Sequence, residues 1–106
     1  MGLNFDLYMG EETVFETNIT HNLTTMANEC GVYELLWKPE ENGYELAGSI
    51  VMELKDGIRK LKSNPKYYRC YDSPNGWGTY ENFLPFCERI LEACMEWSQA
   101  TIKVDR

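Results

Sequence analysis

The densest group of polar side chains in the sequence lies at residues 18 to 22, where Asn18, Thr20, His21 and Asn22 surround one isoleucine. An imidazole can donate, accept or transfer a proton near neutral pH, and side-chain amides and hydroxyls can both donate and accept hydrogen bonds. We expect this segment to join a strand end to a helix start, where free backbone N–H groups attract anionic or amide-bearing ligands. The alternative is that Thr20 and Asn22 only cap the helix and that His21 is a structural side chain.

A second polar group, Asn75-Gly76-Trp77-Gly78-Thr79-Tyr80, places a tryptophan between two glycines. The glycines allow a sharp turn, and the ring can form the wall of a pocket, stack on a planar ligand or cover a partner's side chain. The structural alternative is a tryptophan folded back onto its own core. The candidate ligand-binding residues from both groups are Asn18, Thr20, His21, Asn22, Asn75, Trp77, Thr79 and Tyr80.

Signatures of catalysis and of cofactor binding are missing from the sequence. It contains no GxSxG, HExxH, phosphate-loop or GxGxxG pattern, and its four cysteines form no CxxC pair. We therefore expect no catalytic residue, no cofactor and no metal ligand, and we keep a small hydrolase using His21, with Cys30 as a potential neighbour, as an alternative. Cys87 and Cys94 fall on one face of an expected helix, which favours small buried hydrophobes over a metal or redox site in a reducing compartment.

The charge balance narrows the classes of partner. Seventeen Asp and Glu residues face ten Lys and Arg residues among 106, which gives a net charge of −7. A field of this sign disfavours duplex nucleic acid and favours association with a basic protein. No apolar run approaches the roughly 20 residues that a membrane helix needs, and the start lacks the basic segment and apolar core of a secretory signal.

The two polar groups have to be positioned by elements whose patterns are visible in the sequence. Period-two alternation predicts strands at 3–9 and 13–20, joined as a hairpin, and a short closing strand at 101–105. A helix is expected at 25–37, where Gly31 either weakens it or divides it into two pieces. Apolar residues at spacings of three and four predict a second helix over 47–61.

The last helix is expected to follow a cap at Thr79 and to run to about Trp97. Pro85 would kink a helix that begins at Tyr80, so a start nearer Asn82 is expected to relieve the strain. The resulting order is β-β-α-α-α-β. We predict one α+β domain over 1–106, with a small antiparallel sheet and helices packed on one face.

Three segments resemble a family of small uncharacterised proteins encoded in tailed-phage genomes: NITHNLTTMANECGVYELLW, NGWGTYENF and TIKVDR. The likeness covers nearly the whole chain, although none of these segments is a recognised catalytic signature. The resemblance implies a bacteriophage accessory protein that acts in the cytoplasm of the infected bacterial host cell, outside the virion structure.

Three functions from different classes remain open. The first is a non-enzymatic binding protein that evades host defence by sequestering a small polar or nucleotide-like host signal. The second is an acidic inhibitor of a basic host defence protein, of the anti-CRISPR or anti-restriction type, and the third is the hydrolase. Four aromatic side chains exceed what one face of a small core can bury, which predicts a homodimer that covers the remainder: Tyr33, Trp37, Tyr67 and Tyr68.

Overall fold

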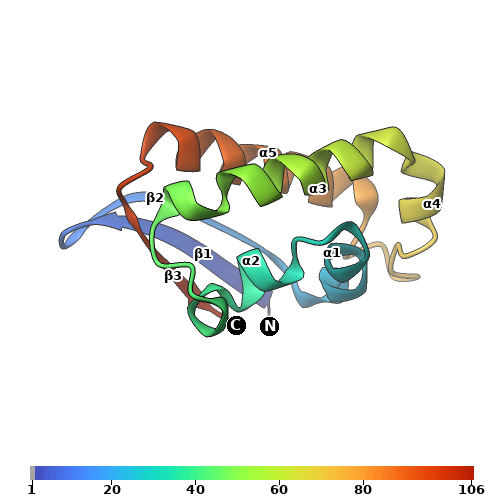
Figure 1. The fold of residues 1–106 in the computed structure, drawn as a ribbon. Coiled ribbons are helices and arrows are strands. Elements are labelled where there is room, and N and C mark those ends of the chain that lie inside the picture. The colour runs from blue at the N-terminus through green and yellow to red at the C-terminus, as the bar shows by residue number, and fades with distance from the viewer. Residues whose placement is uncertain (1) are drawn as a thin grey trace.

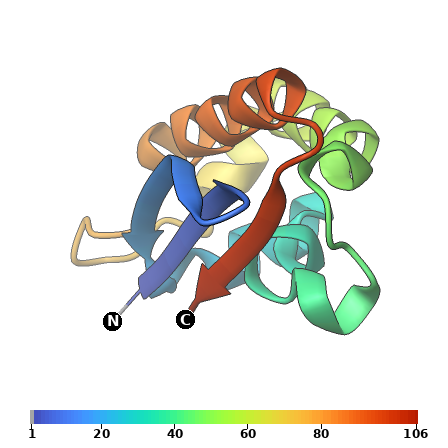
Figure 2. The ribbon, with the colours of Figure 1, turned by 90° about the vertical axis from the view of Figure 1, so that its left-hand side faces the viewer.

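The structure, a computed structural model, describes residues 2–106 apart from the side chain of His21. It contains one antiparallel sheet in the order β2-β1-β3. The strands are β1 (Gly2–Met9), β2 (Glu12–Thr20) and β3 (Thr101–Asp105). Helices cover one face of the sheet, as Figures 1 and 2 show. The predicted α+β class, strand arrangement and element order are confirmed.

The central strand β1 buries every second residue, as its alternating sequence predicts. Leu3, Phe5 and Leu7 are fully buried under the helices, whereas Asn4 lies exposed on the other face. The pairing with β2 shifts between Leu7 and Tyr8, so that Val14 becomes an extra residue in β2. Such a bulge bends its strand and disrupts regular pairing at that point.

The expected helix at 25–37 is divided, which confirms the second of the two alternatives for Gly31. A 3-10 turn, η1 (His21–Leu23), leads into α1 (Thr24–Cys30), and α2 (Tyr33–Trp37) follows. Gly31 ends α1 with a φ of +87°, in the left-handed region that favours glycine.

The strongest helical pattern in the sequence forms the middle of the helical layer. Two short 3-10 segments, η2 (Pro39–Asn42) and η3 (Ala47–Ile50), precede α3 (Val51–Ser63), and the short α4 (Pro65–Arg69) follows it. The predicted helix therefore begins as a 3-10 turn and becomes α-helical at Val51. Its apolar positions point inward, and Leu54 is fully buried.

The last helix, α5 (Tyr80–Glu96), begins where its cap predicts. The Thr79 hydroxyl accepts a hydrogen bond from the Asn82 backbone N–H at 3.3 Å. The expected start nearer Asn82 is wrong, because the helix begins at Tyr80 and accommodates Pro85 in its second turn. Proline has no N–H to donate, so the Glu81 carbonyl loses its intrahelical partner. Glu81 is exposed, and water can satisfy that carbonyl.

The core buries two of the four aromatic side chains on which the predicted homodimer rests. Trp37 and Tyr68 are buried, which leaves Tyr33 half-buried and Tyr67 exposed. The homodimer stays a prediction with a narrower basis. The largest fully buried side chains are Phe5, Phe83, Phe86, Leu3, Leu7, Leu23, Met26, Leu36, Ile50, Leu54, Leu61 and Ile90.

No helix within residues 2–106 combines the length and the apolar character needed to cross a membrane.

Candidate binding surface

The two polar groups of the sequence lie side by side in the fold. The Asn22 side-chain amide donates a hydrogen bond to Ser73 Oγ at 3.4 Å. Gly78 packs directly on Asn22, because a β-carbon at Gly78 would lie 2.9 Å from Asn22 Cβ. Figure 2 shows the loop that precedes α5 beside the far end of β2. The end of the hairpin and the tryptophan loop therefore form one surface.

A hollow of about 330 Å³ lies between these two segments and the first half of α5. Trp77 forms one wall and is 72% exposed, which is unusual for so large an apolar ring. The residues that line the hollow are Asn18, Ile19, Thr20, Trp77, Glu81, Asn82, Pro85 and Arg89. Its polar amide and hydroxyl groups come from β2 and α5, whereas its largest apolar surface comes from the loop.

Three of the eight candidate residues line this hollow, namely Asn18, Thr20 and Trp77. His21 belongs by its backbone to η1, and its side chain lies outside the described part of the structure. What this imidazole does therefore stays a prediction.

The remaining candidates hold the loop in place. Asn75 Oδ1 accepts hydrogen bonds from the Trp77 backbone N–H at 3.0 Å and from Ser73 Oγ at 2.6 Å. Thr79 caps α5, and Tyr80 is buried with its hydroxyl donating to the Leu61 carbonyl at 2.8 Å. These hydrogen bonds hold the loop and the start of α5, and a direct contact of Asn75, Thr79 or Tyr80 with a ligand stays a prediction.

The hollow continues along β2 into a second one of about 400 Å³. Val14 and Phe15 line it from β2, and Arg89 belongs to both hollows. The remaining lining residues come from the end of α5 and the residue after it: Glu92, Ala93, Glu96 and Trp97. We call the two hollows together the β2–α5 groove.

The charges along the groove are only partly paired. Arg69 forms an ion pair with Glu81 at 2.8 Å, and its guanidinium lies 4.9 Å from the centre of the Tyr80 ring. This pairing lowers the pKa of the Glu81 carboxyl. In the described residues, Arg89, Glu92 and Glu96 form no ion pair, so the groove presents one cation and two carboxylates to a partner.

The contribution of α5 was not foreseen from the sequence. Glu81, Pro85 and Arg89 recur every four residues and thus form one helical stripe. Such a stripe on a helix with an apolar opposite face indicates only a solvated surface. Its neighbour across space, the edge strand, is set by the sheet order, which the sequence does not reveal.

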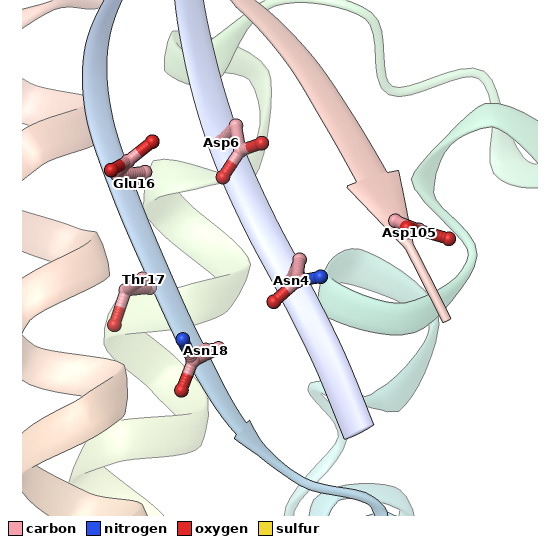
Figure 3. Close-up of a pocket in the computed structure, with 6 residues that line it drawn as sticks. All are labelled: Asn4, Asp6, Glu16, Thr17, Asn18 and Asp105. Carbon is pink, nitrogen blue, oxygen red and sulfur yellow. The ribbon is translucent and has the colours of Figure 1, made fainter. Parts of the chain in front are cut away.

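The open face of the sheet carries another hollow of about 400 Å³, which shares Asn18 with the first one. Figure 3 shows its lining side chains on all three strands: Asn4, Asp6, Glu16, Thr17, Asn18 and Asp105. Partial burial and the nearby charges of Glu16 and Asp105 raise the pKa of Asp6 above its ordinary value. Among the described side chains, no three acidic, cysteine or histidine groups come close enough to hold a metal ion.

The environment of Cys30 bears on the hydrolase alternative. Cys30 is buried, its thiol donates to the Ala27 carbonyl at 3.5 Å, and burial raises its pKa to about 11. A thiol with such a pKa remains protonated at neutral pH and is a weak nucleophile. Cys87 and Cys94 are also buried, in agreement with their prediction as small hydrophobes.

Comparison of this chain with models of known protein families, with curated proteins and with solved structures gave no match.

Proposed function

We propose that this protein is a non-enzymatic binding protein that recognises another protein through the Trp77 end of the β2–α5 groove. The observation that carries the proposal is the exposure of Trp77, at 72%, on a loop whose other polar groups are engaged in holding it. Tryptophan is among the residues that contribute most to protein–protein binding when a partner covers them. The loop thus holds the Trp77 ring in place before a partner binds to it.

The open shape of the groove favours a protein as the ligand over a small molecule that the site would have to enclose. Small-ligand sites bury most of the ligand surface and place a few polar groups inside the cavity. Here the hollow lies open beside Trp77, and no polar or charged residue is buried in the described part of the chain. A bound protein would cover the whole Trp77 ring. A small molecule in this open hollow would leave part of the ring exposed to water.

The net charge of −7 supports a basic partner, because opposite charge raises the association rate. The resemblance to small tailed-phage proteins adds a setting. In this proposal the protein acts in the cytoplasm of an infected bacterium and inhibits a basic host defence protein, of the kind that restriction or CRISPR systems contain.

The test compares two variants that each remove one exposed apolar side chain. Trp77→Ala removes the proposed anchor, and Met52→Ala removes a side chain that is 73% exposed on α3. Tagged wild-type protein is incubated with host lysate, and the retained proteins are identified by mass spectrometry. We expect a protein that the wild type and Met52→Ala retain and that Trp77→Ala loses. Equal retention by all three forms would refute the proposal.

A second candidate function is the sequestration of a small polar or nucleotide-like molecule in the first hollow. It is favoured by the hydrogen-bonding groups of Asn18, Thr20 and Asn82, which line the same hollow as Trp77. The guanidinium of Arg89, which forms no ion pair with a described residue, lines this hollow as well. Native mass spectrometry of protein taken from infected cells separates the two candidates. A bound mass of a few hundred daltons that Trp77→Ala loses would favour the small molecule, and the bare chain mass would exclude it.

A further inference from the structure

We propose that the partner binds as an extended, basic segment that adds a fourth strand to the sheet along the free edge of β2. This inference rests on the proposed function and specifies the partner's chemistry and binding mode. In this mode, backbone hydrogen bonds give affinity, and pockets for alternate side chains give specificity.

The two edges of the sheet differ in how they are covered. Beyond β3, Leu46 forms an isolated bridge with Thr101, and the Ile102 N–H donates to the Glu45 carbonyl at 2.9 Å. No described segment pairs with the outer edge of β2, the strand at the left side of the sheet in Figure 2. An unpaired strand presents a row of N–H and C=O groups that can pair with another chain.

The groove beside this edge has the shape that an added strand needs. β2 is nine residues long, and α5, with seventeen, flanks it from the Trp77 end towards Trp97. Phe15 and Ile19 point towards the helical layer but are only half-buried, whereas their neighbours in β1 are fully buried. Alternate side chains of an added strand would complete this apolar strip.

The charge pattern argues for lysine and arginine in the bound segment. Glu92 and Glu96 are four residues apart on one face of α5, where like charges repel each other. Basic side chains of the partner would relieve this repulsion. Arg89 lies where the two hollows meet, in position to donate to a backbone carbonyl of the bound segment.

The same charges disfavour a second copy of this chain as the occupant. Pairing of two β2 edges would bring the acidic side chains of both copies together, including Glu12 and Glu16 of each strand. Charged side chains on an edge strand are one device by which proteins avoid self-association.

The test begins with a displayed library of random peptides of about twelve residues, which span β2 at roughly 3.3 Å per residue. The library contains acidic and basic members in equal number. We expect enrichment of peptides that carry lysine or arginine within an alternating β-branched pattern, and we expect the Trp77→Ala protein to lose them.

The peptide that binds most strongly is then synthesised in two N-methylated forms. One form carries methyl groups on every second backbone amide, and the other carries them on the remaining amides. Only alternate N–H groups of an added strand point towards β2. One form is therefore expected to lose binding and the other to keep it. The protein variant Glu92→Lys/Glu96→Lys is expected to bind at least about tenfold more weakly. The matched variant Glu34→Lys/Glu53→Lys changes the net charge equally, away from the groove, and is expected to bind normally.

Each other outcome contradicts a defined part of the inference. Equal binding of both N-methylated forms would exclude strand addition while leaving a Trp77-dependent binding protein. Enrichment of acidic peptides, or insensitivity to the Glu92 and Glu96 changes, would exclude a basic partner. Dimerisation in light scattering that the Glu92→Lys/Glu96→Lys changes alter would identify a second copy as the occupant. A library that yields no Trp77-dependent peptide would refute strand addition, and the lysate experiment would still test the proposed function.

Discussion

Gly78 lies against Asn22 so closely that a single added carbon would collide with it. A β-carbon at Gly78 would be 2.9 Å from Asn22 Cβ and 3.2 Å from the Asn22 carbonyl oxygen. Backbone atoms cannot move aside as the end of a flexible side chain can. This contact therefore sets the distance between the tryptophan loop and the end of the hairpin, and it brings Trp77 to the groove.

The first prediction concerns this contact. Gly78→Ala is expected to displace the loop and to cost about 1–3 kcal/mol of folding stability through overpacking. The Trp77 indole N–H resonance should shift, and Trp77-dependent binding should fall. Pro74→Ala, in the same loop and exposed, is the control and should leave both unchanged. A normal melting curve and indole resonance for Gly78→Ala would show that the contact does not set the loop position.

The second prediction separates two tryptophans by their surroundings. Trp77→Ala is expected to change the free energy of unfolding by no more than about 0.5 kcal/mol, because the ring is 72% exposed. Trp37→Ala removes a ring that is 3% exposed and stacked on Tyr33, and it should cost about 3–5 kcal/mol. Urea denaturation measures both. Similar losses for the two variants would mean that Trp77 is a core residue.

The sequence predicts those parts of the fold in which the local pattern and the tertiary environment agree. Leu3, Phe5 and Leu7 alternate because one face of β1 meets the helices, and the spacing around Leu54 repeats because one face of α3 meets the core. Pro85 leads to a wrong prediction of where α5 begins, because the cost of a proline inside the helix is outweighed by other interactions. Thr79 caps the helix before Pro85, and the side chains of Phe86 and Ile90 are buried after it.

The candidate surface is harder to predict than the fold because its parts meet only in three dimensions. That Gly78 rests on Asn22 depends on the sheet order and on the path of the loop, neither of which leaves a periodic trace. Tyr80 looks like a ligand-binding residue in sequence, yet its hydroxyl reaches the Leu61 carbonyl within the core. Arg89 looks solvated until β2 is placed beside it.

The third prediction tests the packing of α3. Leu54→Ala is expected to cost about 2–5 kcal/mol, because this side chain is fully buried and its removal leaves a cavity. Met52→Ala lies two residues earlier on the same helix with its side chain 73% exposed, and it should cost less than about 0.5 kcal/mol. Equal stability of both variants in thermal unfolding would contradict the assigned inward face.

The fourth prediction concerns the pH dependence of stability at Asp6, whose pKa is raised by partial burial and by the charges of Glu16 and Asp105. Lys103 is the register partner of Asp6 on β3, and its ammonium lies 5.0 Å from the centre of the Tyr8 ring. Because the unfolded chain ionises first, near the ordinary pKa of 3.8, Asp6 reduces stability increasingly as the pH rises from that value through the raised pKa of the folded state, and by a constant amount above it. Asp6→Asn should therefore stabilise the protein near neutral pH, by less than about 1 kcal/mol, and should make little difference near pH 3.

Asp56 provides a control with the opposite sign. Hydrogen bonds from Arg59 and Lys60 lower the pKa of this exposed carboxyl on α3. Its contribution to stability is therefore present above its ordinary value of 3.8 and is lost as the pH falls through the lowered value. Melting temperatures measured from pH 3 to pH 8 should rise for Asp6→Asn and fall for Asp56→Asn at the neutral end. If Asp6→Asn lowers the melting temperature at pH 7, the carboxyl of Asp6 stabilises the sheet face, and the proposed repulsion among its acidic groups is wrong.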